Sequence, residues 1–307
     1  MKRYRSTLAA CAVVVSVLVS ACDQAPKHSE PKKHMGQRDI VIGLIPEQNV
    51  FRQRERYLLI QKYLSDDIGI TVNFTSLTRY GNIVERFDGE KLDGAFFGSF
   101  TYALAHSQLG VESIARPVNL DGTSTYHGYI FVRKDSGIRT AADMKGKKFA
   151  FVEHATTAGY LFPLAYFKEH RIAGLNSYLG ESYFAGSHDA AILAVLNREA
   201  DIGAAKNTIY DALAAENPRI EQELVILAAS GAVPQNCLAV RRGLDPELKS
   251  ALKRALLNMD KNPRGIEVLR KFGARGFIET TMKDYEYLYQ LAGQVGMDFK
   301  TYRYKNR

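Results

Sequence analysis

The strongest constraint on the fold of this chain is a regular alternation of short apolar runs with segments of helical spacing. The runs 39–45 (DIVIGLI) and 93–98 (DGAFFG) predict strands, and 52–65 and 100–108 predict helices. The same alternation returns beyond residue 126, where apolar strands again lead into helices. Because such alternation builds sheets covered by helices on both faces, we predict an α/β protein with mixed sheets flanked by helices.

Two loops that contain glycine or proline, near residues 121–122 and 231–236, interrupt this alternation. A chain that leaves one lobe, builds a second and returns has two hinge crossovers. We therefore expect a first lobe at 38–125, a second lobe at 126–235, and a return to the first lobe with the C-terminal helices at 236–307. The ligands of such proteins bind in the cleft between the lobes.

The N-terminal segment has the pattern of an export signal. Three basic residues precede an apolar run at 8–19, which is too short to span a bilayer and is followed by small residues. The residues before Cys22 resemble a bacterial lipobox, so we predict a signal peptide at 1–21 and a lipid on Cys22, which would anchor the protein to a membrane outside the cytoplasm. An ordinary signal peptide with a chance cysteine is the alternative.

The segment that follows Cys22 is predicted to be a tether. Residues 22–37 contain two prolines and almost no apolar side chains, so they cannot bury enough surface to fold. In enteric-type Gram-negative bacteria, an aspartate such as Asp23 after the lipidated cysteine favours retention at the periplasmic face of the inner membrane.

Composition and motifs exclude several classes of function. The formal net charge of +8 includes the three bases of the signal peptide, and no long basic run indicates nucleic-acid binding. Cys237 is the only cysteine of the body, and the histidines lack the spacing of metal ligands. The common hydrolase, nucleotide-binding and metalloprotease motifs are absent from the sequence. We therefore expect a monomer without enzymatic activity, metal or cofactor.

One segment predicts an anion site. Residues 149–160 (FAFVEHATTAGY) read as a strand, a turn, Thr156 and Thr157, and the start of a helix. A helix N-terminus presents unpaired N–H groups and the positive end of the helix dipole. In GSHDAAILAV, His188 stands at the start of another helix. The alternatives are that the threonines only cap their helix and that His188 lies on the surface.

The segments GLIPEQN, LTRYGNIVERFDGEKLDGAFFGSFTYALA, GSHDAAILAVLNREADIGA and NCLAVRRGLDPELK, in this order around the anion segment, carry a resemblance. Over residues 40–259 the chain resembles the phosphate/phosphite/phosphonate-binding subfamily of solute-binding proteins for ABC transporters. The resemblance implies a type II periplasmic binding protein fold, whose two lobes close on a ligand, and no enzymatic activity.

The resemblance also implies a set of ligand-binding residues. The matching positions are Tyr80, Tyr126, Thr156, Thr157 and His188, and further candidates for the pocket are Ser99, Ala158, Lys206, Thr208 and Asn236. Tyrosines are also common as core residues with a polar tip, and a solvated position is commoner for a lysine such as Lys206.

The chain departs from the family pattern at several of these positions. Ala158 stands where a third hydroxyl often follows the threonine pair, and Gly128 stands where a serine often follows Tyr126. Members that bind amino-alkyl phosphonates have carboxylates near the positions of Thr208 and Asn236, which are neutral here. The resemblance therefore implies an intact anion site without an amine site.

Two functions remain open at this point. One is capture of a small oxyanion (phosphate, phosphite or an alkyl phosphonate) for the permease of an ABC importer. The other is sensing, in which the same lobes close on a ligand and the closed form is recognised by a membrane sensor kinase or nucleotide cyclase. Both functions need a tether and a closing cleft, so the sequence does not separate them.

Overall fold

The computed structural model describes residues 39–80, 83–89 and 92–304 of the chain. The predicted signal peptide, the lipidation site at Cys22 and the tether lie outside these residues. Within them, no helix is both long enough and apolar enough to cross a membrane.

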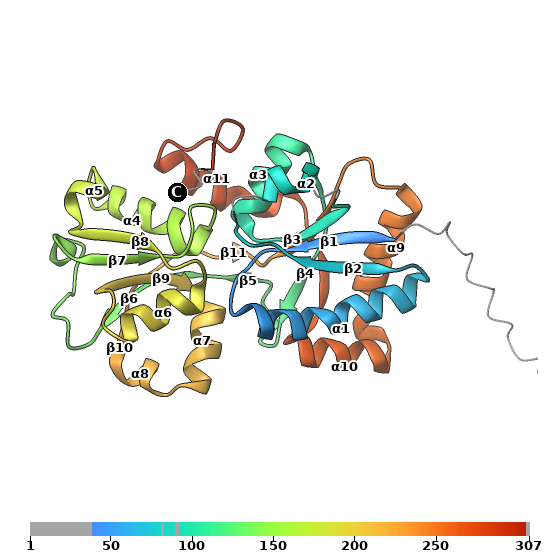
Figure 1. The fold of residues 1–307 in the computed structure, drawn as a ribbon, viewed down its shortest axis with the longest axis horizontal. Coiled ribbons are helices and arrows are strands. Elements are labelled where there is room, and N and C mark those ends of the chain that lie inside the picture. The colour runs from blue at the N-terminus through green and yellow to red at the C-terminus, as the bar shows by residue number, and fades with distance from the viewer. Residues whose placement is uncertain (1–38, 81–82, 90–91, 305–307) are drawn as a thin grey trace, which may run out of the picture. The chain divides into compact units, whose positions relative to one another are not determined.

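The first sheet contains strands from both ends of the described chain (Figure 1). Its order is β13-β4-β12-β3-β1-β2. Strand β1 is parallel to β2 and β3, whereas β12 runs antiparallel to β3 and β4, and β13 antiparallel to β4. The strands are β1 (Ile40–Leu44), β2 (Val72–Ser76), β3 (Gly94–Phe97), β4 (Glu112–Asn119), β12 (Cys237–Val240) and β13 (Ala274–Glu279).

Helices pack against this sheet, and together they make up what we call the first lobe. Helix α1 is capped by Asn49, whose side chain accepts hydrogen bonds from Phe51 N and Arg52 N, and ends at Gly69, which has a φ of 79°. It packs against β2 and α10. The helices are α1 (Val50–Ile68), α2 (Ile83–Gly89), α3 (Ser99–Leu109), α9 (Pro246–Leu257), η3 (Met259–Lys261) and α10 (Pro263–Phe272).

The second sheet is formed by the middle of the chain and has the order β10-β6-β9-β7-β8. Strand β7 is parallel to β8 and β9, and β6 is antiparallel to β9 and β10. The strands are β6 (Gly128–Arg133), β7 (Lys148–Phe151), β8 (Glu181–Phe184), β9 (Ile202–Lys206) and β10 (Leu224–Ala229). These strands and the helices between them form the second lobe.

The helical segments of the second lobe alternate with its strands. Helices α6 and α7 and the π-helix η2 contact β9, and α8 contacts β10. The segments are η1 (Ala142–Met144), η2 (Thr157–Leu161), α4 (Phe162–Glu169), α5 (Leu175–Tyr178), α6 (His188–Leu196), α7 (Asn207–Glu216) and α8 (Arg219–Glu223).

A short ladder joins the two crossings between the sheets. Strand β5 (Thr125–Tyr126) pairs antiparallel with β11 (Val233–Pro234), with Tyr126 opposite Val233. Strands before β5 and after β11 belong to the first sheet, and strands between them belong to the second. The predicted class, mixed sheets flanked by helices, is confirmed.

Two predicted elements differ in detail from the structure, and two strands were not predicted. The first strand expected where the alternation resumes near residue 126 is interrupted at His127, and the helix expected at Thr156 and Thr157 begins as the π-helix η2. Strand β8 was missed because its residues are mostly exposed, so it carries no apolar alternation. Strand β13, which follows α10 directly, was not predicted either.

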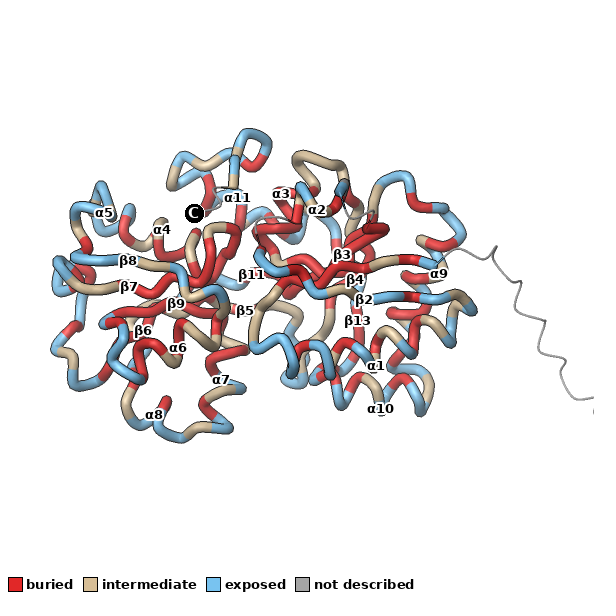
Figure 2. Tube along the Cα trace, viewed as in Figure 1, coloured by how far each residue is buried: buried red, intermediate tan, exposed pale blue. Residues whose placement is uncertain are grey.

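The strands at the centre of each sheet are buried (Figure 2). Every residue of β3, β9 and β12 is buried, whereas helices such as α1 expose their outer faces. Such continuous burial is expected where helices cover both faces of a sheet.

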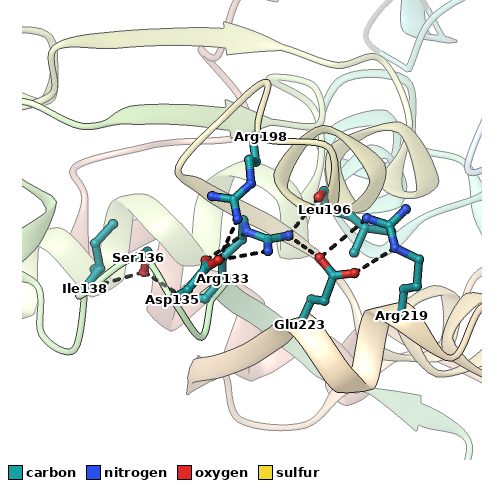
Figure 3. A network of polar contacts seen from close by, with 8 residues as sticks. All are labelled: Arg133, Asp135, Ser136, Ile138, Leu196, Arg198, Arg219 and Glu223. Atoms are coloured by element: carbon teal, nitrogen blue, oxygen red, sulfur yellow. Dashed lines mark hydrogen bonds and ion pairs between the residues drawn. The ribbon is translucent and has the colours of Figure 1, made fainter.

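An ion-pair network ties the end of β6 to two helices of the second lobe (Figure 3). The Arg133 guanidinium donates to Asp135 at 2.9 Å, to Glu223 at 2.6 Å and to the Leu196 carbonyl at 2.9 Å. Hydrogen bonds from Arg133 and then Arg198 lower the pKa of Asp135 to about 2. The network has no residue in either cavity described below.

The C-terminal residues contact both lobes. Helix η4 (Met282–Tyr285) contacts α3, and α11 (Glu286–Gln294) contacts α4 and η2. Farther on, the ring of Tyr302 lies 5.3 Å from that of Phe100, and its hydroxyl donates to the His154 carbonyl at 3.3 Å.

Candidate functional site

A small cavity of about 20 Å³ lies where elements of the two lobes meet. It is lined by all of the residues predicted for the pocket except Thr208, and by five others. The lining residues are Ile45, Glu47, Tyr80, Gly98, Ser99, Phe100, Tyr126, Ala155, Thr156, Thr157, Ala158, His188, Lys206 and Asn236. Thr208 instead lines a second cavity of about 660 Å³.

The two threonines stand at the N-terminus of η2. The Thr156 side chain accepts no capping hydrogen bond from η2, and its hydroxyl donates instead to the Glu153 carbonyl at 2.6 Å. The interpretation that these threonines only cap the helix is therefore wrong. The N–H groups of the first helical turn have no partner within η2, so they remain available to an anion.

Glycine is required at the third residue of η2. A Cβ atom on Gly159 would lie 2.3 Å from the Cβ atom of Val152, which is closer than real side chains approach. The missing side chain lets the start of η2 pack against the residue that follows β7, and this contact sets the position of Thr157.

Three buried donor groups at this cavity lack a hydrogen-bond partner among the described residues. Among the side chains that the structure describes, the buried polar atoms without a hydrogen-bond partner include Tyr80 Oη, Thr157 Oγ1 and Asn236 Nδ2. All three residues line the small cavity. Thr157 lies close enough to Tyr126, and Asn236 close enough to Glu47, to lower the pKa of that neighbour. Within the described part of the chain, however, neither Thr157 Oγ1 nor Asn236 Nδ2 makes a hydrogen bond of acceptable geometry. Buried polar groups are nearly always hydrogen-bonded, so the presence of three such donors at one cavity indicates a ligand that accepts hydrogen bonds.

His188 is a neutral donor. Its side chain is buried, and burial lowers its pKa to about 4. Nδ1 accepts a hydrogen bond from Lys206 N at 3.2 Å, so the ring proton of the neutral form is on Nε2. The backbone N–H of His188 also donates to the Glu47 carbonyl across the lobes at 3.1 Å. The alternative that His188 lies on the surface is wrong.

Tyr126 and Ser99 differ from these donors because they already have partners. The Ser99 hydroxyl donates to the Pro234 carbonyl at 2.7 Å, so it accepts from the Tyr126 hydroxyl at 3.1 Å. Burial raises the pKa of Tyr126 to about 12, which keeps the phenol protonated. These two residues form one wall of the cavity and tie it to the ladder of β5 and β11.

Lys206 is buried, so it does not have the solvated surface position that is commoner for lysines. Its ammonium lies 3.1 Å from Glu47 Oε1 and 3.2 Å from Asn236 Oδ1, and 4.4 Å from the centre of the Tyr126 ring. Burial alone would raise the pKa of Glu47. The charge and hydrogen bond of Lys206, with contributions from His188 and Asn236, together outweigh burial and hold this pKa below its usual value. The two charges offset one another, so a ligand would meet mainly neutral donors.

Glu47 was not among the predicted site residues. It lies three residues beyond the end of β1, at the edge where the ligands of open α/β sheets bind. That position was the only sequence signal for it, because its partner Lys206 is 159 residues away.

The two small residues that depart from the family pattern lie against one another. A Cβ atom on Gly128 would lie 2.9 Å from Phe162, 3.1 Å from the Ala158 Cα and 3.3 Å from its Cβ. The first residue of β6 therefore approaches η2 closely, and a serine at position 128 would need Phe162 to move.

Comparison with known proteins identifies the family of this chain. The profile described as "ABC transporter, phosphonate, periplasmic substrate-binding protein" matches residues 42–285. This chain belongs to that family. By this description, the members of the family are periplasmic substrate-binding components of ABC transporters.

Relatives agree with this assignment. A "Phosphate-import protein PhnD" from Mycolicibacterium smegmatis is 28% identical over 86% of this chain and 85% of its own length. A "Probable ABC transporter phosphite binding protein PhnD1" from Prochlorococcus marinus is 26% identical, over 92% and 96%. A solved structure of PhnD1 from Prochlorococcus marinus with methylphosphonate superposes with a TM-score of 0.74 at 22% identity, covering 84% of this chain and 98% of that one. The structural likeness supports the fold.

Proposed function

We propose that this protein captures a small phosphorus oxyanion (phosphate, phosphite or a short alkyl phosphonate) in the small cavity and delivers it to the permease of an ABC importer. The observation that carries the proposal is the convergence on one cavity of Tyr80 Oη, Thr157 Oγ1 and Asn236 Nδ2, all buried and without a partner among the described residues. A tetrahedral oxyanion offers several acceptor oxygens at once. No observation on the molecule favours the sensing alternative.

A thermal-shift panel tests the ligand class. Phosphate, phosphite and methylphosphonate should raise the melting temperature, and at about 100 times its dissociation constant a ligand adds roughly 2.7 kcal/mol of stability. We expect 2-aminoethylphosphonate to give a smaller shift, because the carboxylate at the cavity, Glu47, is already paired with Lys206. Glutamine and arginine serve as control ligands. If no phosphorus oxyanion shifts the melting curve, the proposal fails.

We further propose that the two lobes close on the ligand. The Asn49 N–H donates to Asp189 Oδ2 at 2.9 Å, and Arg52 pairs with Glu216, so polar contacts join the two lobes. A space of about 20 Å³ holds little more than one water, which needs roughly 10–15 Å³. A phosphate-sized ligand can therefore enter only when the lobes separate.

Small-angle scattering measures this closure. Adding a saturating ligand that is positive in the thermal-shift panel should reduce the radius of gyration through rotation about the β5–β11 crossings. The control is the Thr157→Val variant at about ten times the dissociation constant of the parent protein, where a loss of one to two orders of magnitude in affinity leaves roughly half or more of the variant unliganded. Identical scattering profiles with and without ligand would show a preformed pocket instead.

The lipid anchor is a separate proposal. We expect the Cys22→Ser variant to lose its lipid and to appear in the soluble extracytoplasmic fraction, since the sequence before Cys22 resembles a lipobox. Incorporation of a labelled fatty acid is the measurement. Labelling of Cys22→Ser at the level of the parent protein would contradict the proposal, and Cys11→Ser is the matched control that should keep the label.

A further inference from the structure

The small cavity and the second, larger cavity have three lining residues in common, Glu47, Lys206 and Asn236. The larger cavity, of about 660 Å³, lies beside α1, α7 and the β5–β11 crossings, and Arg52, Asp211 and Gln235 also line it. The three shared residues therefore form the boundary between the small cavity and a much larger one.

These three residues hold one another in place. The Lys206 ammonium is hydrogen-bonded to Glu47 and to Asn236 at 3.1 and 3.2 Å, and it lies over the Tyr126 ring. Lys206 is 4% exposed and Asn236 is 5% exposed, so bulk solvent has little access to either side chain. A buried carboxylate needs a cation beside it, and here the chain supplies that cation itself.

We propose that Lys206 determines specificity: its side chain closes the oxyanion cavity toward the larger one, and its ammonium takes the place beside Glu47 that a ligand ammonium would otherwise occupy. This inference rests on the proposed function. It follows that the native protein accepts phosphorus oxyanions with a very small substituent, and that removing Lys206 creates a site for ω-aminoalkyl phosphonates. The oxyanion end would bind as before, and the alkyl chain would pass between Tyr126 and Asn236 into the larger cavity.

The test compares two ligands of nearly equal size, 2-aminoethylphosphonate and propylphosphonate, by calorimetric titration of the full mature protein. Phosphate and methylphosphonate are titrated in parallel. The variants are Lys206→Ala, which opens the boundary and frees Glu47, Lys206→Met, which keeps most of the bulk, and Lys206→Ala with Glu47→Gln, which opens the boundary without a carboxylate.

In Lys206→Ala, the affinity for 2-aminoethylphosphonate relative to propylphosphonate should rise by about tenfold to a hundredfold, as expected for a hydrogen bond to a charged group. This gain should disappear in the double variant with Glu47→Gln. Lys206→Met should discriminate against both ligands as the parent protein does.

The possible failures are distinct. If the parent protein binds phosphate or methylphosphonate but the ratio in Lys206→Ala is unchanged, the role of Lys206 is refuted and the proposed function stands. If folded Lys206→Ala binds no phosphorus oxyanion, Lys206 is a direct ligand of the oxyanion and the inference is wrong. If the parent protein binds none of them, the proposed function itself fails.

Lys206→Ala leaves a buried carboxylate unpaired and is at risk of not folding. The variant Lys206→Ala with Glu47→Ala has neither charge, so it tests the closure of the boundary alone. Its affinity for propylphosphonate relative to methylphosphonate should increase by about tenfold, because roughly two buried methylene groups gain space. An unchanged ratio would show that Lys206 does not close the cavity.

Discussion

Thr157→Val and Tyr80→Phe should each weaken oxyanion binding by about one to two orders of magnitude, the value of one hydrogen bond to a charged group. The stability of the unliganded protein should stay the same or rise. Both hydroxyls are buried and unpaired among the described residues, so removing them deletes an unsatisfied polar atom. Calorimetric titration with phosphate or methylphosphonate and denaturant unfolding without ligand measure the two effects.

Two control variants separate this result from a general loss of structure. Tyr285 also has a buried hydroxyl without a partner, but it does not line the small cavity, so Tyr285→Phe should leave the affinity unchanged. Thr156→Val removes a hydroxyl that donates to the Glu153 carbonyl, so it should lower stability by about 1 kcal/mol. Unchanged affinity in both Thr157→Val and Tyr80→Phe would remove these hydroxyls from the binding site.

Glu47→Ala should destabilise the protein by about 3–5 kcal/mol, because it leaves the Lys206 ammonium buried without its counter-charge. The side chains of Lys206 and Glu47 are only 6% and 15% exposed, so solvent cannot replace the missing partner. Denaturant unfolding without ligand is the measurement.

Replacing both members of the pair identifies the cause of this loss. Glu47→Ala combined with Lys206→Met removes both charges, and we expect it to recover most of the stability. Glu267→Ala is the control on the surface: it breaks the exposed pair with Lys271 and should have little effect. If the double variant is as unstable as Glu47→Ala, the loss comes from packing and not from an unpaired charge.

Much of the fold could be read from local patterns. The apolar runs at β1 and β3 and the helical spacing of α1 and α3 are local properties of the chain, since a side chain's periodicity depends only on its near neighbours. The strand–turn–threonine pattern likewise predicted the helical N-terminus at η2, and anion binding there stays a prediction. Strand β8 was missed because an exposed edge strand has little apolar pattern to read.

The sequence by itself therefore determined the α/β class, the resemblance to a family and the positions of Tyr80, Tyr126, Thr157 and His188. Tertiary structure alone decided which of their groups are free: Tyr126 is already bonded to Ser99, whereas Tyr80 and Thr157 have no partner among the described residues. It also decided that Thr208 lines the larger cavity and that Glu47 pairs with Lys206. The physical reason is that these contacts join residues 27 to 159 positions apart, and hydrogen bonds and ion pairs depend on distances that only the folded chain sets.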